Sequence, residues 1–61
     1  MCELKAVLNG KMVFKDVVYA KDLGGKVLLR SVLGEEVEVG EAAIYEVDIG
    51  NELLKLRQVT R

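Results

Sequence analysis

Apolar and polar residues alternate over the first part of the chain, and this period of two predicts a β-strand with one buried face. In residues 2–8 the even-numbered positions hold Cys, Leu, Ala and Leu, so we expect these side chains, Cys2 among them, on the inward face. The following pair, Asn9-Gly10, tolerates positive φ at low cost and predicts a tight hairpin turn. Met12 and Phe14 then continue the sheet.

A second hairpin is expected around a pair of glycines. Residues 17–20 form a β-branched and aromatic run, and residues 26–32 form another apolar run. The segment between them ends in Gly24-Gly25, which marks a turn. The two runs should therefore pair as antiparallel strands.

The next predicted strand has an acidic outer face. After a corner at Gly34 and Glu35, residues 36–40 read Glu, Val, Glu, Val, Gly, which places carboxylates outside and valines inside. Residues 41–44 are the one stretch that could hold a helical turn, and they are too short for a stable helix. We expect a single 3₁₀ turn there at most.

The end of the chain predicts a final hairpin and completes the fold. Residues 45–49 alternate, Gly50-Asn51 supplies a turn, and residues 53–59 return as the last strand. The whole pattern amounts to five to six short strands joined by turns. It predicts an all-β fold, a small antiparallel barrel or rolled sheet whose closure hides strand edges.

Composition fits one small globular domain over residues 1–61, because a chain with 51% hydrophobic residues carries more apolar surface than a disordered one. Burial of apolar surface and the conformational entropy of ordering each come to about 90 kcal/mol, so the net stability is small. One cysteine cannot form an internal disulfide. These points favour a homodimer, in which a second subunit adds buried surface.

Charge and hydropathy limit the partners. The net charge of −1 gives no long-range attraction to phosphate backbones or anionic lipid. Residues 1–8 resemble neither a secretory signal nor a transit sequence, and no apolar stretch approaches the roughly 20 residues that span a bilayer. We expect no membrane association and a cytoplasmic protein, where a lone thiol stays reduced.

The residue types argue against an enzyme. The chain has no histidine, which removes the commonest general base and the usual partner of a serine or cysteine nucleophile. It also lacks the glycine motifs that hold nucleotide phosphates. The carboxylates of Glu35, Glu36, Glu38 and Glu41 could bind a hard cation, but a solvated outer strand face explains them without a ligand.

A nucleic-acid surface is the alternative to be weighed. Small barrels bind single strands through aromatic stacking and phosphate contacts. The candidate residues are Lys11, Lys15, Lys21, Lys26, Arg30, Tyr19 and Tyr45. The three aromatic residues must also serve the core, so dispersed lysines that keep the surface solvated are the simpler interpretation.

The only thiol belongs to Cys2, next to Met1 and its α-amine. A thiolate, an α-amino nitrogen and the amide between them can close fused chelate rings around one ion, a planar set that suits Ni(II) or Cu(II). The simpler alternative is a small buried residue that opens a strand, which is the usual role of a free cysteine.

The start Met-Cys-Glu-Leu-Lys-Ala-Val-Leu, the acidic strand near residues 35–39, and the hairpin at residues 44–48 before a Leu-rich last strand resemble the CooT family of nickel-binding accessory proteins of carbon monoxide dehydrogenase maturation. The resemblance covers the whole chain. It implies an SH3-like barrel, a Ni(II) site at the Cys2 thiolate, and association of two subunits around their N-termini. It also implies a partner in carbon monoxide dehydrogenase or its maturation machinery, while the RNA-binding alternative stays open.

With that resemblance, nitrogen donors near the terminus complete the Ni(II) site. If the initiator is retained, we expect the α-amine of Met1, the amide of Cys2 and the amide of Glu3 as candidate donors beside the thiolate. If the initiator is removed, Cys2 supplies both the amine and the thiolate. Deprotonated amides bind strongly to ions that prefer a square plane, so Ni(II) and Cu(II) should be favoured over Zn(II). Copper is the natural competitor.

Overall fold

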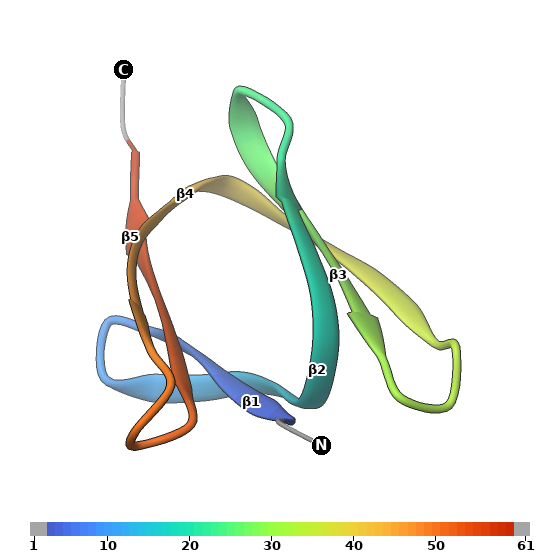
Figure 1. The fold of residues 1–61 in the computed structure, drawn as a ribbon. Coiled ribbons are helices and arrows are strands. Elements are labelled where there is room, and N and C mark those ends of the chain that lie inside the picture. The colour runs from blue at the N-terminus through green and yellow to red at the C-terminus, as the bar shows by residue number, and fades with distance from the viewer. Residues whose placement is uncertain (1–2, 60–61) are drawn as a thin grey trace.

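The computed structural model describes residues 3–59, and its five strands close into a barrel (Figure 1). The strands are β1 (Leu4–Leu8), β2 (Lys11–Asp22), β3 (Gly25–Ser31), β4 (Glu36–Asp48) and β5 (Leu53–Gln58). Neighbouring strands pair antiparallel along the chain, and a parallel pair between β1 and β5 closes the ring. The predicted small all-β barrel is confirmed, with five strands and one parallel pair.

The first hairpin forms at the predicted turn. Asn9 and Gly10 have φ values of 54° and 79°, which is the pair of positive angles that a tight two-residue hairpin requires. The sequence pattern divides residues 12–14 from residues 17–20, but both belong to the single long strand β2. Asp16, at φ 58°, lies where the register of this strand shifts against β1, and the register against β3 shifts just after it, between Val17 and Tyr19. A bulge at this position lets β2 bend, pairing its first half with β1 and its second half with β3.

The 3₁₀ turn expected at residues 41–44 is wrong, because these residues lie inside β4. Glu41 has φ 52°, and the register against β3 shifts between Lys26 and Gly25, so the feature is a β-bulge. The Glu41 carbonyl accepts a bond from the Val59 amide at 2.8 Å. Pairing with neighbouring strands thus satisfies this backbone, and a local helical turn would forgo those bonds.

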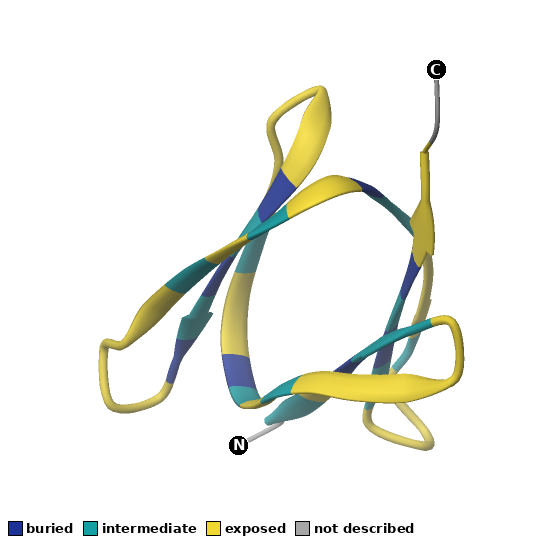
Figure 2. Ribbon diagram, turned by 180° about the vertical axis from the view of Figure 1, so that it is seen from behind, coloured by how far each residue is buried: buried dark blue, intermediate teal, exposed yellow. Residues whose placement is uncertain are grey.

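The core is a set of small and branched apolar side chains. Figure 2 marks the buried positions along the ribbon, and they are spread over several strands of the barrel. The buried members are Ala6, Val17, Val27, Leu29, Ala42, Leu54 and Leu56. Leu4 and Leu8 pack against this core, which confirms the inward face predicted for residues 4–8. Cys2, predicted on the same face, lies outside the described residues.

The last hairpin is held by side-chain hydrogen bonds. Oδ1 of Asp48 accepts a bond from the Asn51 amide at 3.1 Å, and Oδ2 accepts one from Nδ2 of Asn51 at 2.8 Å. Such bonds from Asp to residues farther along the chain are typical of tight turns.

Residues 3–59 contain no helix that is long and apolar enough to cross a membrane.

Candidate functional site

Of the three residues predicted to bind metal, Met1 and Cys2 lie outside the described residues, and Glu3 is the first that the structure describes. Glu3 is half-buried and directly precedes β1. The Lys5 amide donates to the Glu52 carbonyl at 2.9 Å, and Leu4 pairs with Val17 of β2. The strand is therefore fixed on both sides within two residues of Glu3.

Glu3 lines an open depression of about 300 Å³, which we call the rim depression. Its lining residues are Glu3, Lys5, Met12, Lys15, Asp16 and Glu52. Three acidic and two basic side chains make its charge mixed, and the exposed Met12 adds a thioether. Over residues 3–59, no three carboxylate or other metal-ligating side chains come together to hold an ion.

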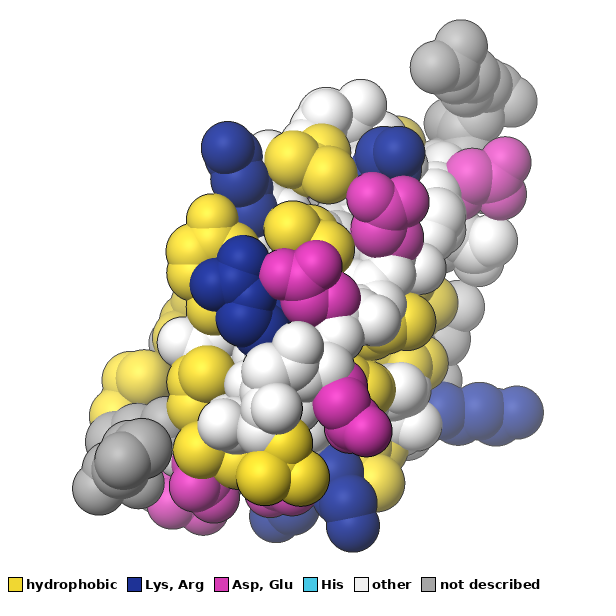
Figure 3. All heavy atoms as spheres, turned by 90° about the vertical axis from the view of Figure 1, so that its right-hand side faces the viewer, with side chains coloured by type: hydrophobic (Ala, Val, Ile, Leu, Met, Phe, Trp, Pro, Cys, Tyr) yellow, Lys and Arg dark blue, Asp and Glu magenta, His cyan; other side chains and the backbone are white. Residues whose placement is uncertain are grey.

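Glu36 and Glu38 of β4 pair with cations of β3 across the sheet. Oε2 of Glu36 accepts a bond from Nε of Arg30 at 2.7 Å, and Oε1 of Glu38 lies 3.3 Å from Nζ of Lys26. Figure 3 shows basic and acidic side chains next to one another on this face. The arrangement is that of a solvated outer face with cross-strand pairs, as the alternation of residues 36–40 predicts.

Several of the residues proposed for nucleic-acid binding make other contacts in the described part of the chain. The Arg30 guanidinium lies over the Tyr19 ring, 4.4 Å from its centroid, and so covers one face of that ring. Lys26 and Arg30 form ion pairs with glutamates. Tyr45 instead lines a groove with Arg57, apart from these cations. The nucleic-acid alternative therefore stays a prediction with less geometric support than the sequence suggested.

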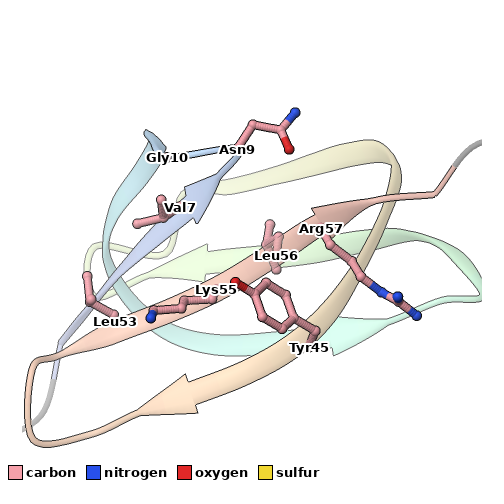
Figure 4. A pocket seen from close by; sticks show the side chains of 8 residues that line it. All are labelled: Val7, Asn9, Gly10, Tyr45, Leu53, Lys55, Leu56 and Arg57. Carbon is pink, nitrogen blue, oxygen red and sulfur yellow. The ribbon is translucent and has the colours of Figure 1, made fainter.

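That groove is a feature that sequence reasoning missed. It is lined by Val7, Asn9, Gly10, Tyr45, Leu53, Lys55, Leu56 and Arg57, and we call it the β1–β5 groove (Figure 4). Its position depends on the parallel pairing of β1 with β5. A local sequence pattern does not predict this pairing, because the two strands are far apart in the chain. One signal was available, because Val7 interrupts the apolar-polar alternation of residues 2–8 with an apolar residue on the outer face.

The fold defines the class of protein as a small SH3-like barrel. The family model described as CO dehydrogenase accessory protein CooT matches residues 1–55, and the chain belongs to this family. Membership indicates an accessory role toward CO dehydrogenase and confirms the resemblance stated above. Comparison with curated proteins gave no match.

Proposed function

We propose that this chain is a nickel carrier that binds Ni(II) through the Cys2 thiolate and delivers it during CO dehydrogenase maturation, without catalysis of its own. The family match carries the proposal, since it spans residues 1–55 and so includes the only cysteine of the chain. Nickel is the cargo in this scheme. A cytoplasmic setting suits it, because thiols stay reduced there.

The chemistry of the donor set fits the cargo. The α-amine of Met1, the amide of Cys2 and its thiolate close two fused chelate rings in one plane, and a deprotonated amide is a strong donor for ions that prefer square-planar geometry. Glu3 or the thiolate of a second subunit would supply the fourth donor. A zinc ion, which prefers a tetrahedron, gains less from this set.

The described surroundings suit transfer. Glu3 and Lys5 line the open rim depression, so ligands of a client protein would have access to an ion held at the preceding residue. A site with one thiolate can pass its ion on by stepwise ligand exchange, whereas a closed four-cysteine cage retains it. This difference favours a carrier over a structural metal site.

We extend the proposal to a homodimer in which two N-termini share the ion. A shared ion would couple loading to association, because metal binding then stabilises the assembled state by mass action. The partner of the loaded dimer would be CO dehydrogenase or its maturation machinery. Native mass spectrometry with and without Ni(II) would report subunit number, metal stoichiometry and whether Met1 is retained.

The decisive experiment is equilibrium dialysis against Ni(II) with absorption spectroscopy. Cys2→Ser is expected to lose uptake and the thiolate-to-nickel charge-transfer band. Met12→Leu is the matched control, since it removes the sulfur of the rim depression and should leave uptake unchanged. Equal uptake by the Cys2→Ser variant would remove Cys2 from the site and end the proposal.

A further chain variant tests the nitrogen donors. Extending the N-terminus by Gly-Ser moves the α-amine away from Cys2 and should weaken Ni(II) binding while leaving the thiol in place.

Cu(II) should compete effectively with Ni(II) in the unmodified protein, because affinity in the divalent series peaks at copper. The nucleic-acid alternative would be favoured instead by a salt-dependent shift of RNA in a gel with metal-free protein.

A further inference from the structure

The β1–β5 groove is an open, mostly apolar hollow of about 530 Å³ on the outside of the barrel. This volume lies within the roughly 300–1,000 Å³ range of ligand sites. Its lining follows β5 from Leu53 to Arg57 and includes Asn9 and Gly10 of the β1–β2 turn. None of its described lining residues belongs to the rim depression.

Its floor comes from outward-facing apolar residues on neighbouring strands. Val7 pairs with Lys55 and Lys5 with Leu53 in the parallel β1–β5 ladder, so Val7 and Leu53 emerge on the same outer face. The register of β4 against β5 shifts between Ile44 and Glu46, which leaves Tyr45 as an extra, exposed residue beside β5. A half-exposed aromatic ring thus borders an apolar floor.

The charges on the groove have one sign. Among the residues that the structure describes, Lys55 and Arg57 are the charged ones that line it, and no carboxylate does. Among residues 3–59 Arg57 forms no ion pair, and Lys55 has one long contact, 3.9 Å to Oε1 of the exposed Glu46. Exposed pairs of this kind contribute little, so the Lys55 ammonium is easily redirected to a ligand.

Neutral polar groups complete the lining. Figure 4 shows Tyr45 between the side chains of Lys55 and Arg57, with Asn9 at the far end of the groove. The phenol and the amide can each donate and accept hydrogen bonds. The site therefore combines an apolar floor, an aromatic wall, two cations and two groups that can bond to a peptide backbone.

From this lining we propose that the β1–β5 groove binds a short acidic peptide segment of a partner protein, one with an apolar or aromatic side chain flanked by carboxylates. The apolar side chain would lie on Val7 and Leu53 against the Tyr45 ring. The guanidinium of Arg57 would donate two parallel hydrogen bonds to a carboxylate of the peptide. Its planar shape fits the carboxylate better than an ammonium does. Since β1 and β5 are paired with each other, the peptide is recognised by side chains and does not add a strand.

The test is a titration of ¹⁵N-labelled, metal-free protein with the capped peptide Ac-Asp-Glu-Phe-Glu-Asp-NH₂, followed by amide chemical shifts. We expect shifts centred on Val7, Asn9, Lys55 and Arg57. The peptide Ac-Asn-Gln-Phe-Gln-Asn-NH₂, which lacks the carboxylates, and an acidic peptide with Gly for Phe should each bind at least about tenfold more weakly.

Two charge-matched variants separate a specific site from general attraction. Arg57→Gln should weaken the acidic peptide at least about tenfold, while Lys21→Gln, which removes the same charge from an exposed site on β2, should change affinity less than about twofold. The spectrum of each variant without peptide reports whether it is folded. A small effect of Arg57→Gln in a folded protein overturns the proposal.

Three further outcomes would also overturn it. Shifts centred on residues outside the groove would place the peptide elsewhere. Tighter binding of an RNA oligonucleotide at the same residues would make the surface a nucleic-acid site. Groove shifts that depend on protein concentration in the absence of peptide would make a second copy of the chain its occupant.

Discussion

The guanidinium of Arg30 lies over the ring of Tyr19, with Cζ 4.4 Å from the ring centroid, and the two residues are direct partners in the antiparallel β2–β3 ladder. Nε of the same guanidinium donates to Glu36 of β4 at 2.7 Å. Arg30 therefore joins three strands on the outside of the barrel. The Arg30 guanidinium is therefore occupied by contacts within the fold, and it covers one face of the Tyr19 ring. Tyr19 thus has less ring surface on which a nucleic-acid base could stack.

Arg30→Ala should lower the free energy of unfolding by about 0.7–2 kcal/mol, since a cation–π contact at an exposed site contributes roughly 0.5–1 kcal/mol and an exposed ion pair roughly 0.2–1 kcal/mol. The free energy of unfolding of Arg30→Lys should lie between those of Arg30→Ala and the wild type, because an ammonium keeps the charge but lacks the planar stacking surface. Urea unfolding followed by circular dichroism measures both. Lys21→Ala is the control, and an equal loss there would show that Arg30 has no special role.

A pair of leucines tests the position of the core. Leu29 is fully buried and Leu33, in the β3–β4 turn, is 83% exposed. Leu29→Ala should cost about 2–5 kcal/mol through lost burial and a cavity, which is enough to unfold a small domain of low net stability. Leu33→Ala should change the free energy of unfolding by less than about 0.5 kcal/mol. Thermal melts of both variants would contradict the structure if the two midpoints fell equally.

Asp48 makes stability depend on pH. Hydrogen bonds from the Asn51 side chain and backbone hold the pKa of this carboxyl below its ordinary value. Because the folded pKa is the lower one, the stabilisation is fully present above the ordinary Asp value of about 3.9 and is lost as pH falls through the folded pKa. The melting temperatures of wild type and Asp48→Ala should therefore differ at neutral pH and converge in acid.

A substitution of Asn51 tests whether its hydrogen bonds cause the lowered pKa of Asp48. Asn51→Ala removes the side-chain donor at 2.8 Å and leaves the Asp48 carboxyl in place. In this background Asp48→Ala should have a smaller effect on the melting temperature, with less dependence on pH. An undiminished effect would mean that Asp48 acts through some contact other than the one with Asn51.

Local rules predicted the features that depend on neighbours in sequence. The Asn9-Gly10 turn and the inward face of residues 4–8 follow from backbone preference and alternation alone. The rules failed at residues 41–44, where bonds to residues distant in the chain decide the conformation. For the candidate site, the choice of Glu3 rests on its place beside Cys2 in the sequence and stays a prediction. The β1–β5 groove could not be predicted locally, because it requires a parallel pair that forms only when the barrel closes.

The bulge in β4 gives a prediction about backbone strain. Glu41 holds φ 52°, which costs a residue with a Cβ about 1–2 kcal/mol, and glycine adopts this angle freely. Glu41→Gly should therefore keep stability unchanged or raise it by up to about 1 kcal/mol after the entropy of glycine is counted. Glu38→Gly, in the same strand, should destabilise. Urea midpoints in the opposite order would contradict the bulge.

Nickel loading should rise steeply with pH if the proposed donors are correct. A free thiol has a pKa near 8.5 and an α-amine near 7.7–8.0, so Ni(II) must displace a proton from each, and from the Cys2 amide when that nitrogen also binds. Below these pKa values each displaced proton raises the apparent affinity about tenfold per pH unit, which gives about 100-fold or more between pH 6 and pH 7. Competition with a chelator of known pH dependence measures this slope.

N-terminal acetylation should reduce the slope by one proton because it removes the amine, and Cys2→Ser should reduce it by the thiol proton. An affinity that does not change between pH 6 and pH 7 would mean that the ion is held by groups already ionised at pH 6, such as carboxylates. A slope that neither change alters would mean that the displaced protons come from groups other than the Cys2 thiol and the terminal amine.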